Sequence, residues 1–272
     1  VSAGMLSWRS GSGSTSEATS SAAGDAPAEA EAPAEAPAEE IEAEGTDPAE
    51  SKPVSAYDVT LLSSAQYPQA IADTDYDGLH EQWTQNVVSD DTYASVQAFS
   101  FATAAKALQN GETSGCFSPL SLYQALAVLT DGAQGQTQAE LLSLLGMPDL
   151  DTLREQSGLL YRRNYFDNNM DRLIISNSLW LDETASDGTP IDYSRDWVMN
   201  AATNYYADVY QAEFSQPDTA QAMGAWIAEK TGGFLHPTLD IDDSTVMSIV
   251  NTVWYKSQWA YQFDAAETTT GD

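Results

Sequence analysis

The sequence predicts an α+β domain that follows a long polar segment. Two runs rich in Val, Ile, Leu and aromatic residues, at 173–183 and 245–259, are long and apolar enough to be strands buried on both faces. In other segments, apolar residues recur at spacings of three and four, which is the period of a helix with one buried face. Strands and helices alternate irregularly and no internal repeat is visible, so a mixed α+β architecture is favoured over a regular repeat.

The composition excludes several classes of partner. The chain carries 41 acidic and 10 basic residues, whereas nucleic acids and anionic membranes are bound through clusters of Lys and Arg, so neither is an expected partner. Cys116 is the single cysteine, so no intrachain disulfide can form. No run of eighteen apolar residues is present to span a bilayer, and no intact secretory signal is visible. With 272 residues, 42% of them hydrophobic, the chain can bury a sizeable core.

Residues 1–50 differ in composition from the rest of the chain. They are rich in Ser and Gly and then in Pro, Ala and Glu, and they hold eleven acidic residues against one basic residue, Arg9. Such a segment cannot bury enough surface to offset its ordering entropy, so we expect a disordered linker, extended to roughly 40 Å or more. Beyond it, acidic residues still outnumber basic ones by thirty to nine. A solvated acidic surface is the preferred explanation, and an acidic binding surface is the alternative.

Residues 51–91 form a transitional N-terminal extension. Asp73, Asp75 and Asp77, followed by Gly, match the first half of a calcium-binding loop. The position at which such a loop needs a bidentate Glu is Thr84, and the flanks lack a helical pattern. An acidic turn is therefore the preferred interpretation, and a calcium site is the alternative. The apolar anchors of the extension are Val59, Leu61, Leu62 and Tyr67.

The folded domain is expected to begin with a helix from Thr92 to an Asn-Gly stop at 110–111. Ser118 and Pro119 then predict the start of a second helix, because Ser can accept the bond of an otherwise unpaired amide and Pro has no amide hydrogen to leave unpaired. This second helix is expected to end at Gly132, with its apolar side chains in one stripe. That stripe consists of Leu122, Leu126 and Leu129.

A third helix is expected from Thr137, which would cap it together with Glu140, to Gly146. Further helical patterns lie at 191–206 and 218–231. The buried face of the third helix is predicted to consist of Leu141, Leu144 and Leu145.

No sequence motif for catalysis is present. The chain lacks the nucleophile elbow, the phosphate-binding loop, the H-E-x-x-H zinc motif and the dinucleotide fingerprint. His80 and His236 are interpreted as surface or hydrogen-bonding residues rather than general bases. Cys116 is interpreted as a small buried residue rather than a nucleophile, and Asp182 and Glu183 as a solvated strand end rather than half of a carboxylate pair. We therefore do not expect an enzyme, and no cofactor is implied.

Four stretches in order, over roughly residues 92–272, resemble the serpin family. The first is FSPLS with the helix after it, followed by DGAQGQT and LLSLLG. The second is the strand LIISNSLWLDE, and the third is the helical segment GAWIAEKTGGFL. The fourth is MSIVNTVWYKSQWAYQFDAAET, which is similar to the long central strand of the family. Departures from the family pattern are small: Cys116 replaces an aromatic or aliphatic residue, Tyr255 the common Phe, and Ser257 the common Gly.

The resemblance implies the serpin fold, with several helices and a large central mixed sheet, and a suicide-substrate inhibitor of serine or cysteine proteases. A protease attacks an exposed reactive loop, which then inserts into the central sheet as an extra strand. Ser118, Ser121 and Asn251 match the family's shutter, where the strands must part. Trp259 matches the aromatic residue at the breach, where insertion begins.

The resemblance also implies that the sequence covers the N-terminal half of the domain and stops before the reactive loop, so the reactive site is absent. On its own, such a chain is expected to be inactive, to end on an unpaired long strand and to fold without cooperativity. The implied protein is monomeric and extracellular or tethered at the cell surface. A serpin-fold protein that acts as a binder or chaperone without inhibition is the alternative.

Overall fold

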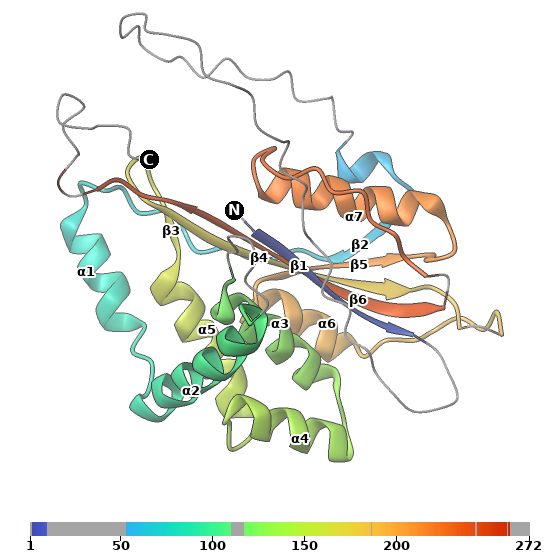
Figure 1. Ribbon diagram of the computed structural model, residues 1–272, viewed down its shortest axis with the longest axis horizontal. Helices are drawn as coiled ribbons and strands as arrows, with labels where there is room; N and C mark the ends of the chain where they lie inside the picture. The colour runs from blue at the N-terminus through green and yellow to red at the C-terminus, as the bar shows by residue number, and fades with distance from the viewer. Residues whose placement is uncertain are drawn as a thin grey trace, which may run out of the picture.

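A computed structural model describes residues 2–9, 53–109, 117–185, 187–242, 244–259 and 261. Within these ranges the strands form one mixed sheet, in the order β1, β6, β4, β5, β2, with β3 paired to β4 (Figure 1). β4 runs antiparallel to β6 and parallel to β5. The strands are β1 (Ser2–Arg9), β2 (Thr60–Ser63), β3 (Phe166–Asp167), β4 (Arg172–Asp182), β5 (Ala207–Ala212) and β6 (Thr245–Lys256).

Helices cover both faces of this sheet. α7 and the short helix η1 lie over one face, and α2 to α6 lie on the opposite side (Figure 1). This α+β arrangement confirms the predicted fold class. The helices are η1 (Val54–Ala56), α1 (Tyr76–Gln85), α2 (Asp90–Ala107), α3 (Pro119–Gly132), α4 (Gly135–Leu145), α5 (Leu150–Asn164), α6 (Arg195–Asn204) and α7 (Pro217–Lys230).

The two predicted long strands, β4 and β6, form the centre of the sheet. Leu179 and Leu181 of β4 pack with the α2 to α6 core, whereas Trp180 between them packs with the α7 core. All three side chains are fully buried, because successive residues of a strand point to opposite faces and both faces are covered.

The sequence identified several helix ends correctly. The Ser118 Oγ accepts the amide of Ser121 at 3.3 Å, with Pro119 at the first helical position of α3. Gly146 ends α4 in the left-handed conformation, at a φ of 68°. α2, α7, β4 and β6 lie where the patterns predict them, although α6 begins later than expected, after the capping residue Ser194.

Two predictions about α4 are wrong. Thr137 does not cap the helix, because α4 begins two residues earlier, after Gln134, and has no side-chain cap. Gln138 instead donates to the carbonyl of Ala133 at 2.7 Å, at the C-terminal end of the preceding helix α3. Leu144 is 56% exposed, and Leu142 packs against the core in its place. The helix is therefore rotated relative to the predicted face.

Residues 2–9 also correct a prediction. The sequence predicts disorder throughout 1–50, but Ser2–Arg9 form β1, antiparallel to the outer edge of β6. The rest of the predicted linker lies outside the described residues. Because β1 pairs with β6 as far as Val253, the expectation that the last strand is unpaired is wrong for most of its length. The expected non-cooperative folding of this chain stays a prediction.

The extension at 51–91 contributes to the opposite edge of the sheet. β2 pairs antiparallel with β5, and Val54 of η1 is buried in the core beneath α7. α1 was not predicted, because its apolar residues are few, and in the structure they are half-buried at most. Asp75 caps the start of this helix by accepting the amide of Gly78 at 3.0 Å. The apolar anchors are mixed: Leu61 is 50% exposed, whereas Tyr67 packs against a small aromatic cluster.

Asp208 of β5 ties the extension to the sheet and to α7. Its carboxylate is 3% exposed and accepts the Ala65 amide at 2.9 Å and the Ser64 hydroxyl at 3.3 Å. It also accepts the Trp226 Nε1 at 3.0 Å and pairs with the Lys230 Nζ at 3.1 Å. This buried carboxylate therefore joins the extension, a strand and a helix.

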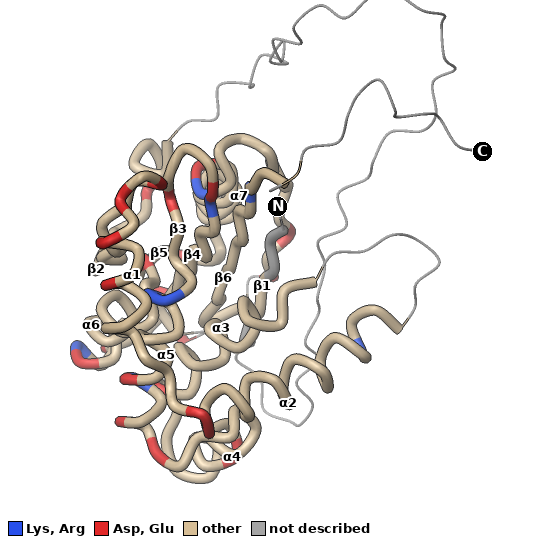
Figure 2. Tube along the Cα trace, turned by 90° about the vertical axis from the view of Figure 1, so that its left-hand side faces the viewer, with Lys and Arg blue, Asp and Glu red and all other residues tan. Residues whose placement is uncertain are grey.

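Among the described residues, Asp and Glu positions lie on several separate helices and loops (Figure 2). A solvated acidic surface stays a prediction. Within the described ranges, no helix is long and apolar enough to cross a membrane.

Gly232, after α7, provides a test of local packing. It adopts a φ of 61°, and a Cβ atom there would overlap the ring of Trp254 in β6. We expect Gly232→Ala to lower the free energy of unfolding by about 2 to 4 kcal/mol, because backbone strain and overpacking add. Gly135→Ala is the matched control, since Gly135 has a φ of 60° and no atom within 4 Å of the added Cβ. Equal losses in denaturant unfolding of the two variants would contradict the predicted overlap.

Candidate functional site

Six polar side chains lie across the middle of β4 and β6, deep in the sheet. Each is at most 5% exposed, although the strands around them are mostly apolar. The pairing of the strands sets Ser176 opposite Thr252 and Asn177 opposite Asn251. We call these six residues the polar band: Ser176, Asn177 and Ser178 of β4, and Ser248, Asn251 and Thr252 of β6.

Two asparagines form the centre of the polar band. The Asn251 Nδ2 donates to the Asn177 Oδ1 at 2.5 Å, and the Asn177 Nδ2 donates to the backbone carbonyl of Tyr205 at 2.9 Å. Tyr205 is the residue directly after α6, at its C-cap position. The pair therefore connects β6 through β4 to the end of a helix by side-chain hydrogen bonds, which can be exchanged when the strands separate.

The other members of the polar band are satisfied to different degrees. The Ser178 Oγ accepts the Trp180 Nε1 at 2.8 Å, and the Ser248 Oγ donates to the backbone carbonyl of Leu6 in β1 at 3.2 Å. The Thr252 Oγ1 is buried and has no hydrogen-bond partner within the described part of the chain. A buried hydroxyl without a partner costs about 1 to 3 kcal/mol.

The structure brings only some of the predicted site residues together. α3, which carries Ser121 and is capped by Ser118, packs against β6. No hydrogen bond joins Asn251 to either serine among the described residues, and its partner is Asn177 instead. Sequence reasoning missed Asn177 as a site residue, although an Asn in the middle of an apolar strand is a signal of a specific buried partner. Trp259 follows β6 and is 72% exposed.

The remaining candidates do not form a second site. His80 on α1 and His236 after α7 are exposed and belong to separate elements. Cys116 lies outside the described residues. Asp75 caps α1, and nowhere in the described ranges does a group of three or more His, Cys, Asp or Glu side chains stand ready to hold a metal ion. Asp75 thus has a capping role, and the choice between an acidic turn and a calcium loop at Asp73, Asp75 and Asp77 stays a prediction.

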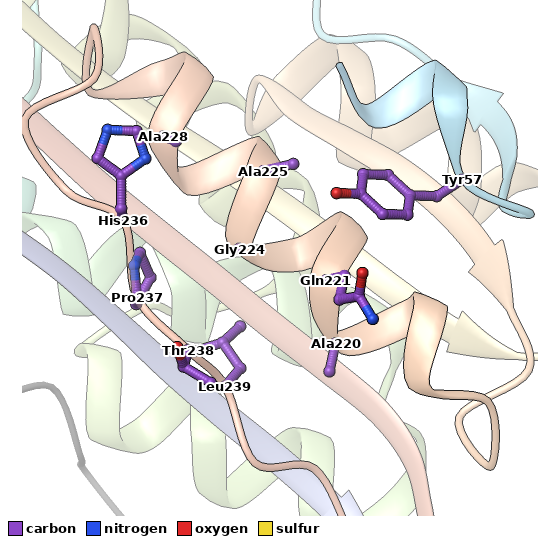
Figure 3. Close-up of a pocket in the computed structure, with 10 residues that line it drawn as sticks. All are labelled: Tyr57, Ala220, Gln221, Gly224, Ala225, Ala228, His236, Pro237, Thr238 and Leu239. Carbon is purple, nitrogen blue, oxygen red and sulfur yellow. The ribbon is translucent and has the colours of Figure 1, made fainter. Parts of the chain in front are cut away.

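A small pocket lies between η1, α7 and the loop that follows α7 (Figure 3). Its volume is about 230 Å³, which is below the usual size of a small-molecule site. Alanines and Gly224 form much of its wall along α7, with His236 on the opposite side. The polar side chains in the lining are those of Tyr57, Gln221, His236 and Thr238. The full lining is Tyr57, Ala220, Gln221, Gly224, Ala225, Ala228, His236, Pro237, Thr238 and Leu239.

Asp182, at the end of β4, corrects another prediction. The sequence favours a solvated strand end, but the residue is 6% exposed and its carboxylate accepts the Phe214 amide at 3.3 Å. Burial raises the pKa of Asp182, and the nearby Glu213 raises it further, while the bond from Phe214 opposes both effects. The neighbouring Glu183 is exposed, so the two carboxylates lie in different environments.

This environment predicts a pH-dependent effect of Asp182→Asn. A carboxyl group whose folded pKa is raised binds protons more tightly in the folded state, so its contribution to stability falls as the pH rises through the folded pKa. The variant removes the buried charge and keeps an oxygen acceptor for Phe214. We expect its melting temperature to exceed that of the wild type at pH 7, with the difference shrinking towards pH 4.

Asp187→Asn is the control of opposite sign for this prediction. Asp187 is exposed, and bonds from Thr189 lower its pKa, so its carboxylate contributes stability at neutral pH that is lost as the pH falls. We expect this variant to melt slightly below the wild type at pH 7. A lower melting temperature for Asp182→Asn at pH 7 would contradict the assigned burial of that charge.

Comparison with known proteins identifies relatives of this fold. The family model described as "Serpin (serine protease inhibitor)" matches residues 94–272. Serine protease inhibitor A3K of mouse is 27% identical over 186 residues, covering 65% of this chain and 43% of that protein. Putative serpin-Z12 of rice is 31% identical over 158 residues, covering 56% of this chain and 35% of that protein.

A solved structure supports the same relationship at the level of the fold. The thermophilic serpin tengpin in its latent state matches with a TM-score of 0.58 and 24% identity, covering 66% of this chain and 48% of tengpin. The chain thus spans less than half the length of each of these three proteins.

Proposed function

The chain belongs to the serpin family, and on this basis we propose that it is part of a serine-type protease inhibitor that traps its target by inserting a loop into the sheet built on β4 and β6. The proposed partner is a serine or cysteine protease. The inhibitor acts once and supplies no catalytic group of its own, because the target enzyme performs the bond cleavage.

The proposed chemistry balances without a cofactor. The nucleophilic Ser or Cys of the protease attacks a peptide carbonyl of the reactive loop, and the protease's general base takes its proton. The peptide C–N bond breaks, the new amine takes a proton and leaves, and an ester or thioester joins the loop to the protease. Insertion of the loop as a new strand then moves the protease away from its productive geometry before water can hydrolyse that bond.

The asparagine pair is the observation that carries the proposal. A sheet that must open needs interactions between its strands that can be broken and re-formed, and hydrogen bonds between Asn177 and Asn251 meet this need better than fused apolar side chains. α3 supports β6 from beneath, with Ser118 and Ser121 at its start.

We further propose an extracellular or surface-tethered location and a monomeric state. The strongly acidic composition of the chain, with 41 acidic against 10 basic residues, suits a well-solvated protein.

Formation of a covalent complex tests the proposed activity. The complete natural polypeptide containing this sequence is incubated with serine proteases of trypsin, chymotrypsin and subtilisin specificity. We expect one of them to yield a 1:1 complex that survives boiling in detergent and dissociates at alkaline pH, as an acyl ester does. The same protease with its active-site serine replaced by Ala is the control and should form no complex. Cleavage or no reaction with every protease, without a covalent band, would overturn the proposal.

A further inference from the structure

β1 comes from a part of the chain that the family match does not include. The match covers 94–272, whereas β1 is Ser2–Arg9. It pairs with β6 in continuous antiparallel register, from Ser2 opposite Val253 to Trp8 opposite Met247. The strand therefore occupies the outer edge of β6 along most of the polar band, with Gly4 opposite Asn251 and Ser7 opposite Ser248.

Side-chain packing and hydrogen bonding both hold β1 in place. Met5 is half-buried and packs against the core beneath α7, which includes Trp180 and Val250. The backbone carbonyl of Leu6 accepts the hydroxyl of Ser248, a member of the polar band. β1 is thus bound by apolar burial on one face and by a bond to the polar band, in addition to backbone pairing.

Two parts of the N-terminal segment differ in composition: the part that contains β1 and the part that follows it. Residues 1–16 contain no acidic residue and no proline, whereas 17–52 contain eleven acidic residues and four prolines. Proline cannot donate to a sheet ladder, and like charges on adjacent positions repel. Of residues 1–52, the first sixteen are therefore the part suited to pair with a strand, and the rest is suited to be a spacer.

We propose that Ser2–Arg9 is a tethered strand that occupies the outer edge of β6 and competes there with any other strand. The edge has one row of backbone donors and acceptors, so it can pair with one strand at a time. The tether at 10–52 keeps β1 at an effective concentration of up to about 1 mM, so a free strand must outcompete an intramolecular one. A regulatory role for β1 rests on the proposed function, because β1 would then exclude the reactive loop from the edge of β6.

Peptide binding tests the competition without any protease. The probe is a fluorescein-labelled peptide with the sequence SAGMLSWR, and its binding to the chain is followed by fluorescence anisotropy. Met5→Asp places a charge against the apolar core and should release β1. We expect the peptide to bind Met5→Asp at least about 100-fold more tightly than the wild type. Thr15→Asp adds the same charge outside β1 and should exclude the peptide as the wild type does.

Two further measurements keep the test decisive. The peptide SAGMPSWR, with Pro in place of the Leu of β1, should fail to bind Met5→Asp. Amide hydrogen exchange should be faster in β6 of Met5→Asp than in the wild type, with the protection of β4 and β5 retained. If Met5→Asp loses protection throughout, a chain in which eight Gly and Ser residues replace Ser2–Arg9 is tested in the same way.

The outcomes separate this inference from the proposed function. Equal binding of SAGMLSWR to all variants, or binding to none of them, overturns the competition at β6 and leaves the covalent-complex test unaffected. Exclusion by the wild type, combined with binding to Met5→Asp, supports the tethered strand even if no protease is trapped. That result would support competition by β1 at the edge of β6 and would overturn only the proposed inhibitory function.

Discussion

Asp208→Ala is expected to lower the free energy of unfolding by about 3 to 5 kcal/mol, the range for a buried ion pair that loses one partner. The substitution leaves the Lys230 ammonium, the Trp226 indole and the Ala65 amide without their acceptor. Burial lowers the pKa of Lys230, but the charge of Asp208 and its hydrogen bond to the ammonium oppose this effect, and the pKa is raised overall, so the charge persists in the folded wild type at pH 7. Chemical denaturation at pH 7 measures the loss, and hydrogen exchange should show the extension at 53–67 opening first.

A control and a double variant make this prediction specific. Asp240→Ala removes the same charge from an exposed position and should change stability by less than about 0.5 kcal/mol. Asp208→Ala combined with Lys230→Met should be clearly less destabilising than the sum of the two single changes, because the uncompensated charge is gone. Additive losses would contradict the assigned pairing.

Asn177→Leu is expected to cost about 2 to 4 kcal/mol, because Asn251 and the carbonyl of Tyr205 each lose a buried partner. Leu has the branching of Asn but a larger volume, so overpacking at this buried position adds to the loss of hydrogen bonding. The loss is measured by chemical denaturation of the chain.

The double variant Asn177→Leu, Asn251→Leu separates stability from function. The single variant leaves the Asn251 amide and the Tyr205 carbonyl without their partner. The double variant also removes the Asn251 amide, so we expect part of the lost stability to return. In the complete natural polypeptide, the same double variant should trap less protease than the wild type, because apolar packing between β4 and β6 resists parting. Full trapping by the double variant would show that the asparagine pair has no role in opening the sheet.

Sequence reasoning succeeded where structure is decided locally. Ser118 and Pro119 mark a helix start by their own chemistry, Gly146 marks a helix end, and the apolar runs of β4 and β6 are long enough to require burial on both faces. The predicted shutter residue Asn251 is buried at the centre of the polar band. Its role in opening the sheet remains a prediction.

The parts that were missed depend on contacts between distant residues. β5 has only six residues and α5 has a polar composition, so neither element has a pattern that predicts it from sequence. β1 forms because a complementary edge exists at β6, more than two hundred residues away, and no local pattern in a Gly- and Ser-rich segment encodes that partner. Asp182 was predicted to be solvated because the segment that buries it, around Phe214, lies about thirty residues later in the chain, between β5 and α7.

Thermal unfolding before and after cleavage tests the central claim, that the sheet built on β4 and β6 accepts a loop as a new strand. The complete natural polypeptide is cut once in its exposed loop by a protease it does not trap, and both forms are melted at the same concentration. Insertion of the cleaved loop predicts a rise in melting temperature of more than about 10 °C, equivalent to at least about 3 kcal/mol. An unchanged or lower melting temperature would contradict it and would indicate a serpin-fold binder that does not insert its loop.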